Sequence, residues 1–458
     1  MANAVTAEST SDKPLTSYDE LVALFSSAEK PKSEFRVGAE MEKFGVLADG
    51  SPMPYEGEHG VLALMKDLAA TQGWKAESET EDGPIVALLR DGASITLEPG
   101  SQFELSGAPL VHAHEICAEF HGHLAEIAPF SERAGIRWLG VGFHPFAKRE
   151  EYVMVPKQRY GIMREYLPTR GSMALDMMLR TSTVQANYDY DSERDAMLKM
   201  RVALRLAPLT TALFANSPFY EGKPFGGKTY RGKVWLDTDP DRSGLVPPLW
   251  KKNATYIDYV EWALDVPMFM FKRNGKKMVN TGQTFRSFFK TGFQGHRALA
   301  SDWQMHLNTL FPEVRLKKTI EVRAADAQGA KMACALPALY SGILYDAKAL
   351  AEADALTHDW TLDEVTALRK DVPQKGLGAR FRVGTLVPIA EKLLTIAEGG
   401  LERRAFLSPS GNDERVHLAR LKELVEKGET PADRLLQGLD RFVDPRAEIL
   451  ARCDLGTT

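Results

Sequence analysis

Residues 35–45 alternate between polar and apolar side chains, a pattern that predicts a β-strand. Alternate side chains of a strand point to the same face. Glu40 and Glu42 are therefore expected to lie side by side, with Met41 on the opposite face. Taken alone, a Glu-x-Glu pattern is also typical of the hydrated face of an edge strand, so a site is indicated only if other strands add carboxylates.

Residues 95–107 form a second predicted strand with acidic side chains. Gln102 and Glu104 share one face. Glu98 stands just before a Pro-Gly pair, which is expected to bend the strand and re-aim it. This strand follows short predicted strands at residues 74–79 and 85–90, and the Asp-Gly turns between them indicate an antiparallel meander.

A third acidic strand is predicted at residues 316–326. Its apolar residues face the core, so Glu321 and Arg323 share the other face. The two side chains form either a simple ion pair within the strand or a metal-binding carboxylate next to a substrate-binding arginine.

Carboxylates that converge on one face of a sheet repel each other. The repulsion is about 1 kcal/mol per pair in water and about 4 kcal/mol at an effective dielectric constant of 20. A cation between them removes this penalty, and oxygen-only ligands favour Mg²⁺, Mn²⁺ or Ca²⁺ over zinc. The candidate metal ligands are Glu40, Glu42, Glu98, Glu104 and Glu321.

The stretch at residues 176–188 has a β-branched centre and is predicted to be a strand. Thr183, Gln185 and Asn187 would share a face, and Arg180 would point to the other face unless a bulge intervenes. This polar face is either a wall of a substrate site or a hydrated edge strand.

Helical periodicity predicts most of the remaining elements. The helix at residues 112–133 carries four histidines, but none pairs with another at the i,i+4 spacing that suits a metal, so a hydrated face is expected. Further helices are predicted at residues 17–26, 58–72, 156–166, 192–214, 256–264 and 303–310, and beyond residue 332 at 352–369, 387–398 and 416–427.

Residues 222–229 match the P-loop pattern letter by letter. A P-loop needs a strand before it and a helix after it, so that the loop amides and the helix N-terminus bind phosphate. Here the pattern predicts a helix before the motif and a strand after it, which argues against a P-loop, although Lys228 or Arg231 could still contact phosphate. The basic stretch at residues 273–297 is either a loop beside an active site or an exposed insertion.

Composition narrows the function classes. The chain has 458 residues with 44% hydrophobic content and a net charge of −5, which argues against nucleic-acid or anionic-membrane binding. No apolar run reaches transmembrane length. The cysteines at 117, 334 and 453 lie far apart without zinc or disulfide spacing, which fits a reducing compartment, so a cytoplasmic protein is expected. Residues 1–16 lack the apolar core of a signal peptide and are expected to be a disordered tail.

Several segments resemble the plant and proteobacterial type of glutamate–cysteine ligase, and the resemblance extends from about residue 17 to about residue 450. Met41 departs from the family's Glu-His-Glu, but it is expected to point away from the two glutamates. The segments that carry the resemblance are residues 36–45, 97–107, 176–181, 213–219, 264–268 and 311–317.

The resemblance implies an α+β, glutamine-synthetase-like fold in which a curved, mainly antiparallel sheet forms a funnel with helices packed outside. It implies one catalytic domain at residues 17–450, largely helical from about residue 332, followed by a tail at 451–458. The implied ligands are ATP, L-glutamate, L-cysteine and two or three Mg²⁺ ions, which Mn²⁺ could replace. The γ-carboxylate of glutamate would be phosphorylated and then attacked by the cysteine amine, and the enzyme is expected to be a monomer or a weak homodimer.

The resemblance also suggests roles for residues around the glutamates. Arg323 and Arg231 would be catalytic and neutralise the transferring phosphoryl group. Substrate binding is expected from Gln185, Asn187 and Arg180, and nucleotide binding from Lys228 and Arg231. Three alternatives remain: a glutamate ligase with another acceptor amine, a P-loop NTPase, and a non-catalytic metal- or amino-acid-binding protein.

Overall fold

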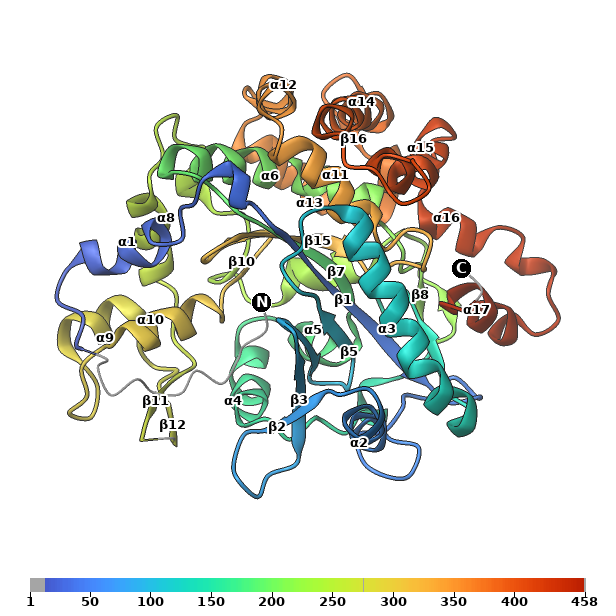
Figure 1. Cartoon of the computed structure of the whole chain (residues 1–458), viewed down its shortest axis with the longest axis horizontal. Helices are drawn as coiled ribbons and strands as arrows, with labels where there is room; N and C mark the ends of the chain where they lie inside the picture. The colour runs from blue at the N-terminus through green and yellow to red at the C-terminus, as the bar shows by residue number, and fades with distance from the viewer. Residues whose placement is uncertain (1–12, 275, 457–458) are drawn as a thin grey trace.

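The structure is a computed structural model that describes residues 13–274 and 276–456, and an antiparallel sheet runs through its middle (Figure 1). Its strand order is β14-β15-β7-β1-β5-β4-β3-β2, with β6 pairing with the end of β1. The strands are β1 (Val37–Val46), β2 (Lys75–Ser78), β3 (Ile85–Arg90), β4 (Ala93–Leu97), β5 (Phe103–Ser106), β6 (Arg137–Leu139), β7 (Thr183–Tyr188), β14 (Val314–Leu316) and β15 (Ile320–Asp326).

The three predicted acidic segments lie close together because β1 pairs with β5 on one side and with β7 on the other. β15 pairs with β7 in turn. One face of these strands carries the polar side chains and the other is apolar, as the alternation predicts: Met41, Leu105 and Val184 are buried on the apolar face. The predicted α+β fold with a mainly antiparallel sheet is confirmed.

Helices cover the sheet and its edges. α3 and α11 contact β1, α6 packs on β14 and β15, and α2 lies against β2 and β3. The helices up to residue 310 are α1 (Tyr18–Ser26), α2 (Val61–Thr71), α3 (Ala113–Ala134), α4 (Gln158–Tyr166), α5 (Ala174–Arg180), α6 (Glu193–Leu213), α7 (Tyr230–Val234), α8 (Tyr256–Leu264), α9 (Phe285–Thr291) and α10 (Ala300–Leu307).

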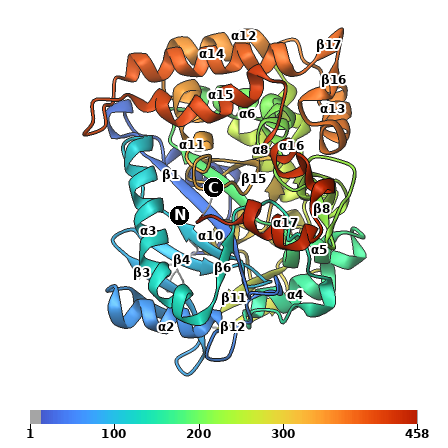
Figure 2. The same ribbon diagram turned by 90° about the vertical axis from the view of Figure 1, so that its right-hand side faces the viewer.

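The C-terminal part is largely helical, as predicted, and forms a layer at one side of the molecule (Figure 2). α14 packs against α11, α12 and α15 in this layer. The C-terminal helices are α11 (Ala335–Leu344), α12 (Ala347–Thr357), α13 (Leu362–Lys375), α14 (Val387–Arg404), α15 (Ala419–Glu426), α16 (Pro431–Leu436) and α17 (Pro445–Cys453).

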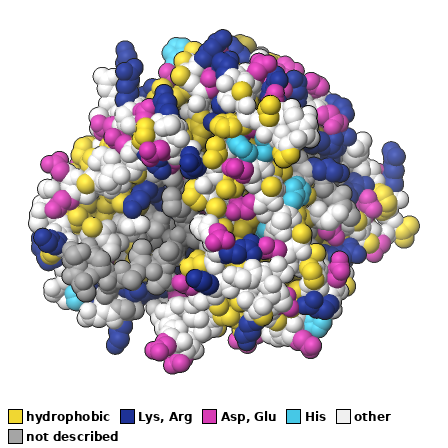
Figure 3. Space-filling model, in the orientation of Figure 1, with side chains coloured by type: hydrophobic (Ala, Val, Ile, Leu, Met, Phe, Trp, Pro, Cys, Tyr) yellow, Lys and Arg dark blue, Asp and Glu magenta, His cyan; other side chains and the backbone are white. Residues whose placement is uncertain are grey.

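Small two-stranded pairs complete the fold. They are β8 (Phe219–Tyr220) with β9 (Lys223–Pro224), β10 (Ser243–Gly244) with β13 (Phe311–Pro312), β11 (Met270–Arg273) with β12 (Lys276–Val279), and β16 (Arg380–Phe381) with β17 (Gly384–Thr385). None of the described helices is long and apolar enough to span a membrane. Charged side chains of both signs are spread over the face shown in Figure 3.

Two predicted strands have a different local structure. The segment at residues 95–107 is a hairpin of β4 and β5, because the chain reverses at Ser101, whose φ is +66°. The N–H of Glu98 donates to the carbonyl of Gln102 (3.0 Å) and closes this turn. The segment at residues 176–188 begins in helix α5, and only its second half is a strand, β7.

The predicted boundaries of the helical regions also change. The single helix expected at residues 352–369 is two helices, α12 and α13, with the buried Trp360 between them. The expected hydrated histidine face of α3 is wrong at His123, which is buried and stacks on Phe103. Periodicity cannot reveal these features, because a break or an inward-facing histidine depends on the partner surface.

The ends of the chain are more ordered than expected where they are described. α17 continues through Cys453, and Leu455 is buried and donates its N–H to the carbonyl of Trp138 (2.8 Å), so the expected tail from residue 451 is wrong there. Near the N-terminus Leu15 is buried, and its N–H donates a hydrogen bond to the carbonyl of Ala298 (2.8 Å). The rest of the expected N-terminal tail, residues 1–12, lies outside the described residues.

Lys43 is a fully buried lysine on the apolar face of β1. Its ammonium donates a hydrogen bond to the carbonyl of Phe103 (3.3 Å) and lies over the rings of Phe103 and Trp138. Burial lowers the pKa of Lys43 to about 7, and the charges of Glu104 and Glu42 oppose this shift. The sheet therefore carries a cationic group directly behind its acidic strands.

Replacing Lys43 with methionine should stabilise the protein, and most strongly at pH 7 and below. The unfolded chain keeps this lysine protonated up to about pH 10.4, whereas the folded chain releases the proton near pH 7. As the pH rises from about 7 to about 10.4, the free energy of unfolding of the parent therefore increases, by at most about 1.4 kcal/mol per pH unit. The stability advantage of the variant should shrink over the same range. Denaturant unfolding at several pH values measures the difference, with Lys66→Met on the exposed side of α2 as control. An advantage that does not change with pH contradicts a buried titrating lysine.

Candidate active site

Four glutamates converge on the polar face of the central sheet. Glu42 of β1 lies opposite Glu104 of β5 in the antiparallel ladder, and Glu40 lies two residues before Glu42 on the same face. Glu98, in the turn between β4 and β5, acts electrostatically on both Glu42 and Glu104. The register of the sheet and the turn at Glu98 therefore bring these four side chains close together, as the alternation predicts.

Burial and mutual repulsion change the protonation of this cluster. Burial raises the pKa of Glu104 to about 7, with contributions from the charges of Glu40 and Glu98. Burial, followed by the charges of Glu98 and Glu104, raises the pKa of Glu42 well above its usual value. Such groups keep their protons near neutral pH unless a cation takes the place of those protons.

Hydrogen bonds from β4, β5 and β7 orient three of the carboxylates, which fixes the positions of the oxygen atoms. The donors are Nδ2 of Asn187 to Glu40 (2.9 Å), the backbone N–H of Thr183 to Glu42 (3.0 Å), and the hydroxyls of Thr96 and Ser106 to Glu104 (2.6 and 2.7 Å).

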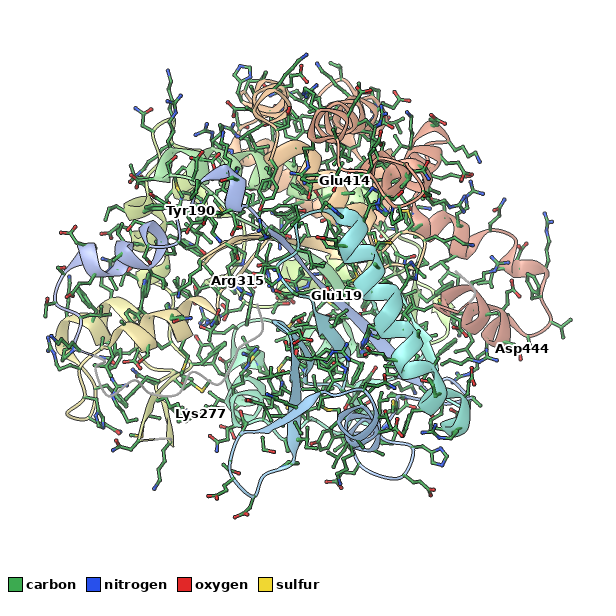
Figure 4. All side chains as sticks on the ribbon, viewed as in Figure 1. Glu119, Tyr190, Lys277, Arg315, Glu414 and Asp444 are labelled. Atoms are coloured by element: carbon green, nitrogen blue, oxygen red, sulfur yellow. The ribbon has the colours of Figure 1, made fainter. Side chains whose placement is uncertain are left out.

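Glu321 lies on the same sheet face but among cations. It is fully buried on β15, and Arg315 of β14 binds both of its oxygens through two guanidinium nitrogens. Lys317 and Arg323 each lie 3.3 Å from its oxygens. Burial opposes ionisation, but these three cations hold the pKa of Glu321 well below its usual range. Figure 4 places Arg315 toward the middle of the molecule, between the sheet and the helices beside it.

Two predicted catalytic arginines stand between the acidic cluster and Glu321. Arg323 donates to Oε1 of Gln185 (2.5 Å), and Arg231 of α7 donates to the backbone carbonyl of Arg323 (2.9 Å). Both guanidinium groups act on Glu42 and lower its pKa. The structure thus brings Arg231, Arg323, Gln185 and the carboxylates together.

Asn187 also belongs to this face. It bridges Glu40 and Thr319, whose hydroxyl donates to Oδ1 of Asn187 (3.0 Å). In the sheet register Gln185 lies opposite Glu40, and Asn187 lies opposite Glu321. The polar face predicted for β7 therefore lies between the acidic cluster and the cations around Glu321, and it is not a hydrated edge of the sheet.

Arg180 has a different environment from the one expected for a substrate-binding residue. It is the last residue of α5 and is 1% exposed. Its guanidinium binds Asp176, Glu221 and the carbonyl of Ala147, and it lies over the ring of Tyr220. These contacts make Arg180 a structural residue, because they occupy its hydrogen-bonding groups inside the fold.

Two backbone amides and the lysine of the P-loop-like segment bind protein groups. The N–H groups of Lys228 and Thr229 both donate to the carbonyl of Pro373 (2.9 and 3.1 Å), so they cannot cradle a phosphate. The ammonium of Lys228 pairs with Asp433 of α16, and its role in nucleotide binding stays a prediction. The strand expected after this motif is wrong, since residues 230–234 form the short helix α7, with the Thr229 hydroxyl as its N-cap.

Sequence patterns missed three cations near the glutamates. Arg315 and Lys317 reach Glu321 because the chain reverses between β14 and β15, which places Arg315 directly opposite Glu321. Lys157 donates to the carbonyl of Leu97 (2.8 Å), and burial lowers its pKa to about 8, opposed mainly by Glu98. The break between β14 and β15 could have indicated Arg315, but nothing in the spacing indicates Lys157.

The basic stretch at residues 273–297 is structured where it is described. It contributes to the β11–β12 hairpin and contains α9. Lys277 of β12 binds Glu79, which also accepts the N–H of Gln158 at the start of α4 (Figure 4). The hairpin is thereby tied to the segment that precedes β3 and to the helix that follows Lys157.

Comparisons with known proteins identify the family of this chain. The model of glutamate-cysteine ligase family 2 (GCS2) matches residues 36–448. The chain is 45% identical to a chloroplastic glutamate–cysteine ligase of Brassica juncea, with 93% of this chain and 81% of that protein covered. It is 44% identical to the chloroplastic enzyme of Arabidopsis thaliana, with 93% and 80% covered. These plant relatives contradict the cytoplasmic location expected from the cysteines.

A solved structure shares the fold. The glutamate–cysteine ligase of Francisella tularensis, solved in complex with AMP, matches with a TM-score of 0.55 at 13% identity and covers 92% of this chain and 87% of its own. This match confirms the predicted glutamine-synthetase-like fold. From the family match over residues 36–448 and the identity to the plant enzymes, the chain belongs to glutamate-cysteine ligase family 2.

Proposed function

We propose that this chain joins the γ-carboxylate of L-glutamate to the amine of L-cysteine with ATP, the first step of glutathione synthesis. The observation that carries the proposal is the acidic cluster of Glu40, Glu42, Glu98 and Glu104 facing Arg231 and Arg323, in a member of this ligase family. ATP would phosphorylate the glutamate γ-carboxylate, and the cysteine amine would then displace phosphate from the resulting γ-glutamyl phosphate. No enzyme nucleophile is needed, because phosphoryl transfer depends mainly on positioning and charge neutralisation.

The acidic cluster fits a hard divalent cation. Its donors are carboxylate oxygens, which suit Mg²⁺ or Mn²⁺. The raised pKa values of Glu42 and Glu104 indicate that these two carboxylates are costly to ionise without a cation. Glu40, Glu42, Glu98 and Glu104 would hold two or three such ions, which supply positive charge against the phosphates when bound. We assign Glu321 only a secondary role in metal binding, because it can bind an ion only by giving up part of its pairing with Arg315.

The arginines and amides organise the other side of the site. Arg323 is held by Gln185 and Glu321, so its guanidinium is fixed beside the acidic cluster. Arg231 is held by the carbonyl of Arg323. We assign these two guanidinium groups to the transferring phosphoryl group, which they would stabilise by charge-assisted hydrogen bonds. Gln185 and Asn187 would orient the glutamate substrate between the two charged groups.

The acceptor amine is the main alternative. A related ligase could use the same acyl phosphate with another amine, and the side chains described above recognise phosphate and carboxylate more specifically than a thiol. Cysteine is proposed because the plant relatives are glutamate–cysteine ligases. The expected monomer or weak homodimer stays a prediction.

ADP release with glutamate, ATP and Mg²⁺ tests the function while the acceptor amino acid is varied. We expect the greatest turnover with L-cysteine, no turnover after exhaustive EDTA treatment, and no rescue by zinc. Turnover that is greatest with another amine would identify a different ligase. Glutamate binding without any ADP release would identify a binding protein.

Glu98→Gln separates metal binding from folding. The substitution keeps the shape of the side chain and removes its charge, so turnover should fall by about 10²–10³, the cost of one electrostatic contact to a transition state. Metal-free stability should stay the same or rise, because the charge of Glu98 adds to the burial that raises the pKa values of Glu42 and Glu104. Steady-state rates and thermal unfolding of the metal-free protein measure both effects. Glu58→Gln, at an exposed position, is the control. A variant that unfolds much earlier but keeps its specific activity makes Glu98 structural.

Lys228→Ala tests the P-loop alternative. The folded variant should bind ATP and retain a substantial fraction of activity, since Lys228 pairs with Asp433. The lost ion pair is partly exposed and should cost no more than about 1 kcal/mol of stability. Lys233→Ala on the exposed side of α7 serves as the matched control. Loss of ATP binding in a folded Lys228→Ala protein, but not in the control, would favour the P-loop.

A further inference from the structure

Two cysteines that are 217 positions apart in the sequence lie close together on helices that cover the sheet. Cys117 lies on α3, and Cys334 is the N-cap residue of α11. His417 joins them from the 3-10 helix η7 (Glu414–Leu418). One ligand atom from each of the three side chains lies within 4.8 Å of the other two. The spacing of the cysteines along the sequence does not indicate this contact, because packing between α3 and α11 creates it.

We propose that Cys117, Cys334 and His417 form a binding site for a thiophilic divalent cation such as Zn²⁺. Two thiolates and one imidazole are the donor set of a zinc site with an open fourth position. Zinc–sulfur bonds of about 2.3 Å and zinc–nitrogen bonds of about 2.0 Å require donor atoms roughly 3.5–3.8 Å apart. The three side chains need only small rotations to reach that spacing from their present separation of at most 4.8 Å.

A second histidine supports the site. Nε2 of His417 lies 3.0 Å from Nδ1 of His114, and the two rings are 4.8 Å apart between their centroids. Outer partners of this kind fix the ring orientation of metal-bound histidines. Nε2 of His114 is buried and has no hydrogen-bond partner within the described part of the chain.

The surroundings favour a thiolate. Hydrogen bonds from Cys334 and His417 lower the pKa of the Cys117 thiol to about 4, against the effect of its burial. The same contact with Cys117 raises the pKa of Cys334, so the pair shares one negative charge. The N-terminus of α11 lies at Cys334, where the helix dipole stabilises an anion. A soft cation binds such a pair in preference to Mg²⁺, which suits the carboxylates of the active site.

The proposed site would connect three separate parts of the chain. α3 and α11 both contact β1, and η7 contacts α3, α11 and α14. Glu414 of η7 already links the same elements, since it accepts the N–H of Ala113 (2.8 Å) and binds Arg404 (Figure 4). A bound cation would add a cross-link beside this junction and stabilise the folded chain, by an amount that grows with the logarithm of the cation concentration divided by its Kd.

Cobalt substitution tests the site in the full-length chain. The protein is reduced, freed of metal and kept under anaerobic conditions, and Co²⁺ is added at increasing concentration. We expect thiolate-to-cobalt charge-transfer absorption that saturates at one ion per chain and disappears on addition of Zn²⁺. Co²⁺ bound to the carboxylates of the active site gives no such bands, so the two sites are distinguished.

Variants assign the ligands. Cys117→Ser and Cys334→Ser should each abolish the charge-transfer bands, and His417→Ala should weaken cobalt binding. Cys453→Ser, at a buried cysteine of α17, and His358→Ala, at an exposed histidine, should leave the bands unchanged. Bands that are absent from the parent, or that persist in both serine variants, overturn the proposal.

Alkylation of the unsubstituted chain tests the site without relying on variants that fold poorly. Zn²⁺ should slow the reaction of Cys117 with iodoacetamide, measured by peptide mass spectrometry, and should raise the melting temperature of the parent. Equal alkylation rates with and without Zn²⁺ overturn the proposal. So does recovery of the two cysteines as a disulfide from the reduced, zinc-treated protein, because a disulfide leaves no thiolates to bind the cation.

Discussion

The repulsion between carboxylates on neighbouring strands is the constraint around which this structure is arranged. Backbone hydrogen bonds fix β1 between β5 and β7, and this register places Glu42 opposite Glu104. The two carboxylates can separate only if the backbone hydrogen bonds between the strands break or the register shifts. A shift by one residue would move every side chain of the strand to the opposite face of the sheet. The apolar face of the same strands is buried in the core, which prevents such a shift. The sheet thus holds the carboxylates close together, and burial and their mutual charges raise the pKa values of Glu42 and Glu104.

The opposite charge is organised by the same sheet. The register of β7 with β15 sets Glu321 opposite Asn187, and the reversal between β14 and β15 brings Arg315 onto Glu321. Glu321 therefore fixes three cations at one edge of the polar face, while the other four glutamates occupy the rest of it. A face divided into an acidic and a basic part can bind a polyphosphate through cations on one side and an anionic transferring group through guanidinium groups on the other.

The helical parts of the chain connect distant segments around this sheet. The P-loop-like segment is an example, because its amides and Lys228 join the carbonyl of Pro373 and the carboxylate of Asp433 in the C-terminal part. Arg180 and Asp176 have a similar structural role between α5 and the segment at Glu221. In both cases a residue type that binds phosphate or carboxylate ligands binds the protein itself. The cysteine and histidine cluster lies at a further junction of this kind, where donors from three elements meet.

The sequence by itself determined which strands carry carboxylates and which way they face, because side-chain alternation is a local property of the backbone. It also determined the helical C-terminal part, but it predicted the wrong element after the P-loop-like segment, where helix α7 and not a strand follows Thr229. Only the tertiary structure decided which charges meet. The pairing of Arg315 with Glu321, the burial of Arg180, the position of Lys157 and the approach of Cys117 to Cys334 all depend on chain reversals and on packing between segments far apart in sequence. Spacing along a chain does not encode such contacts, because they form only when the backbone ladder and the core have fixed the strands and helices relative to one another.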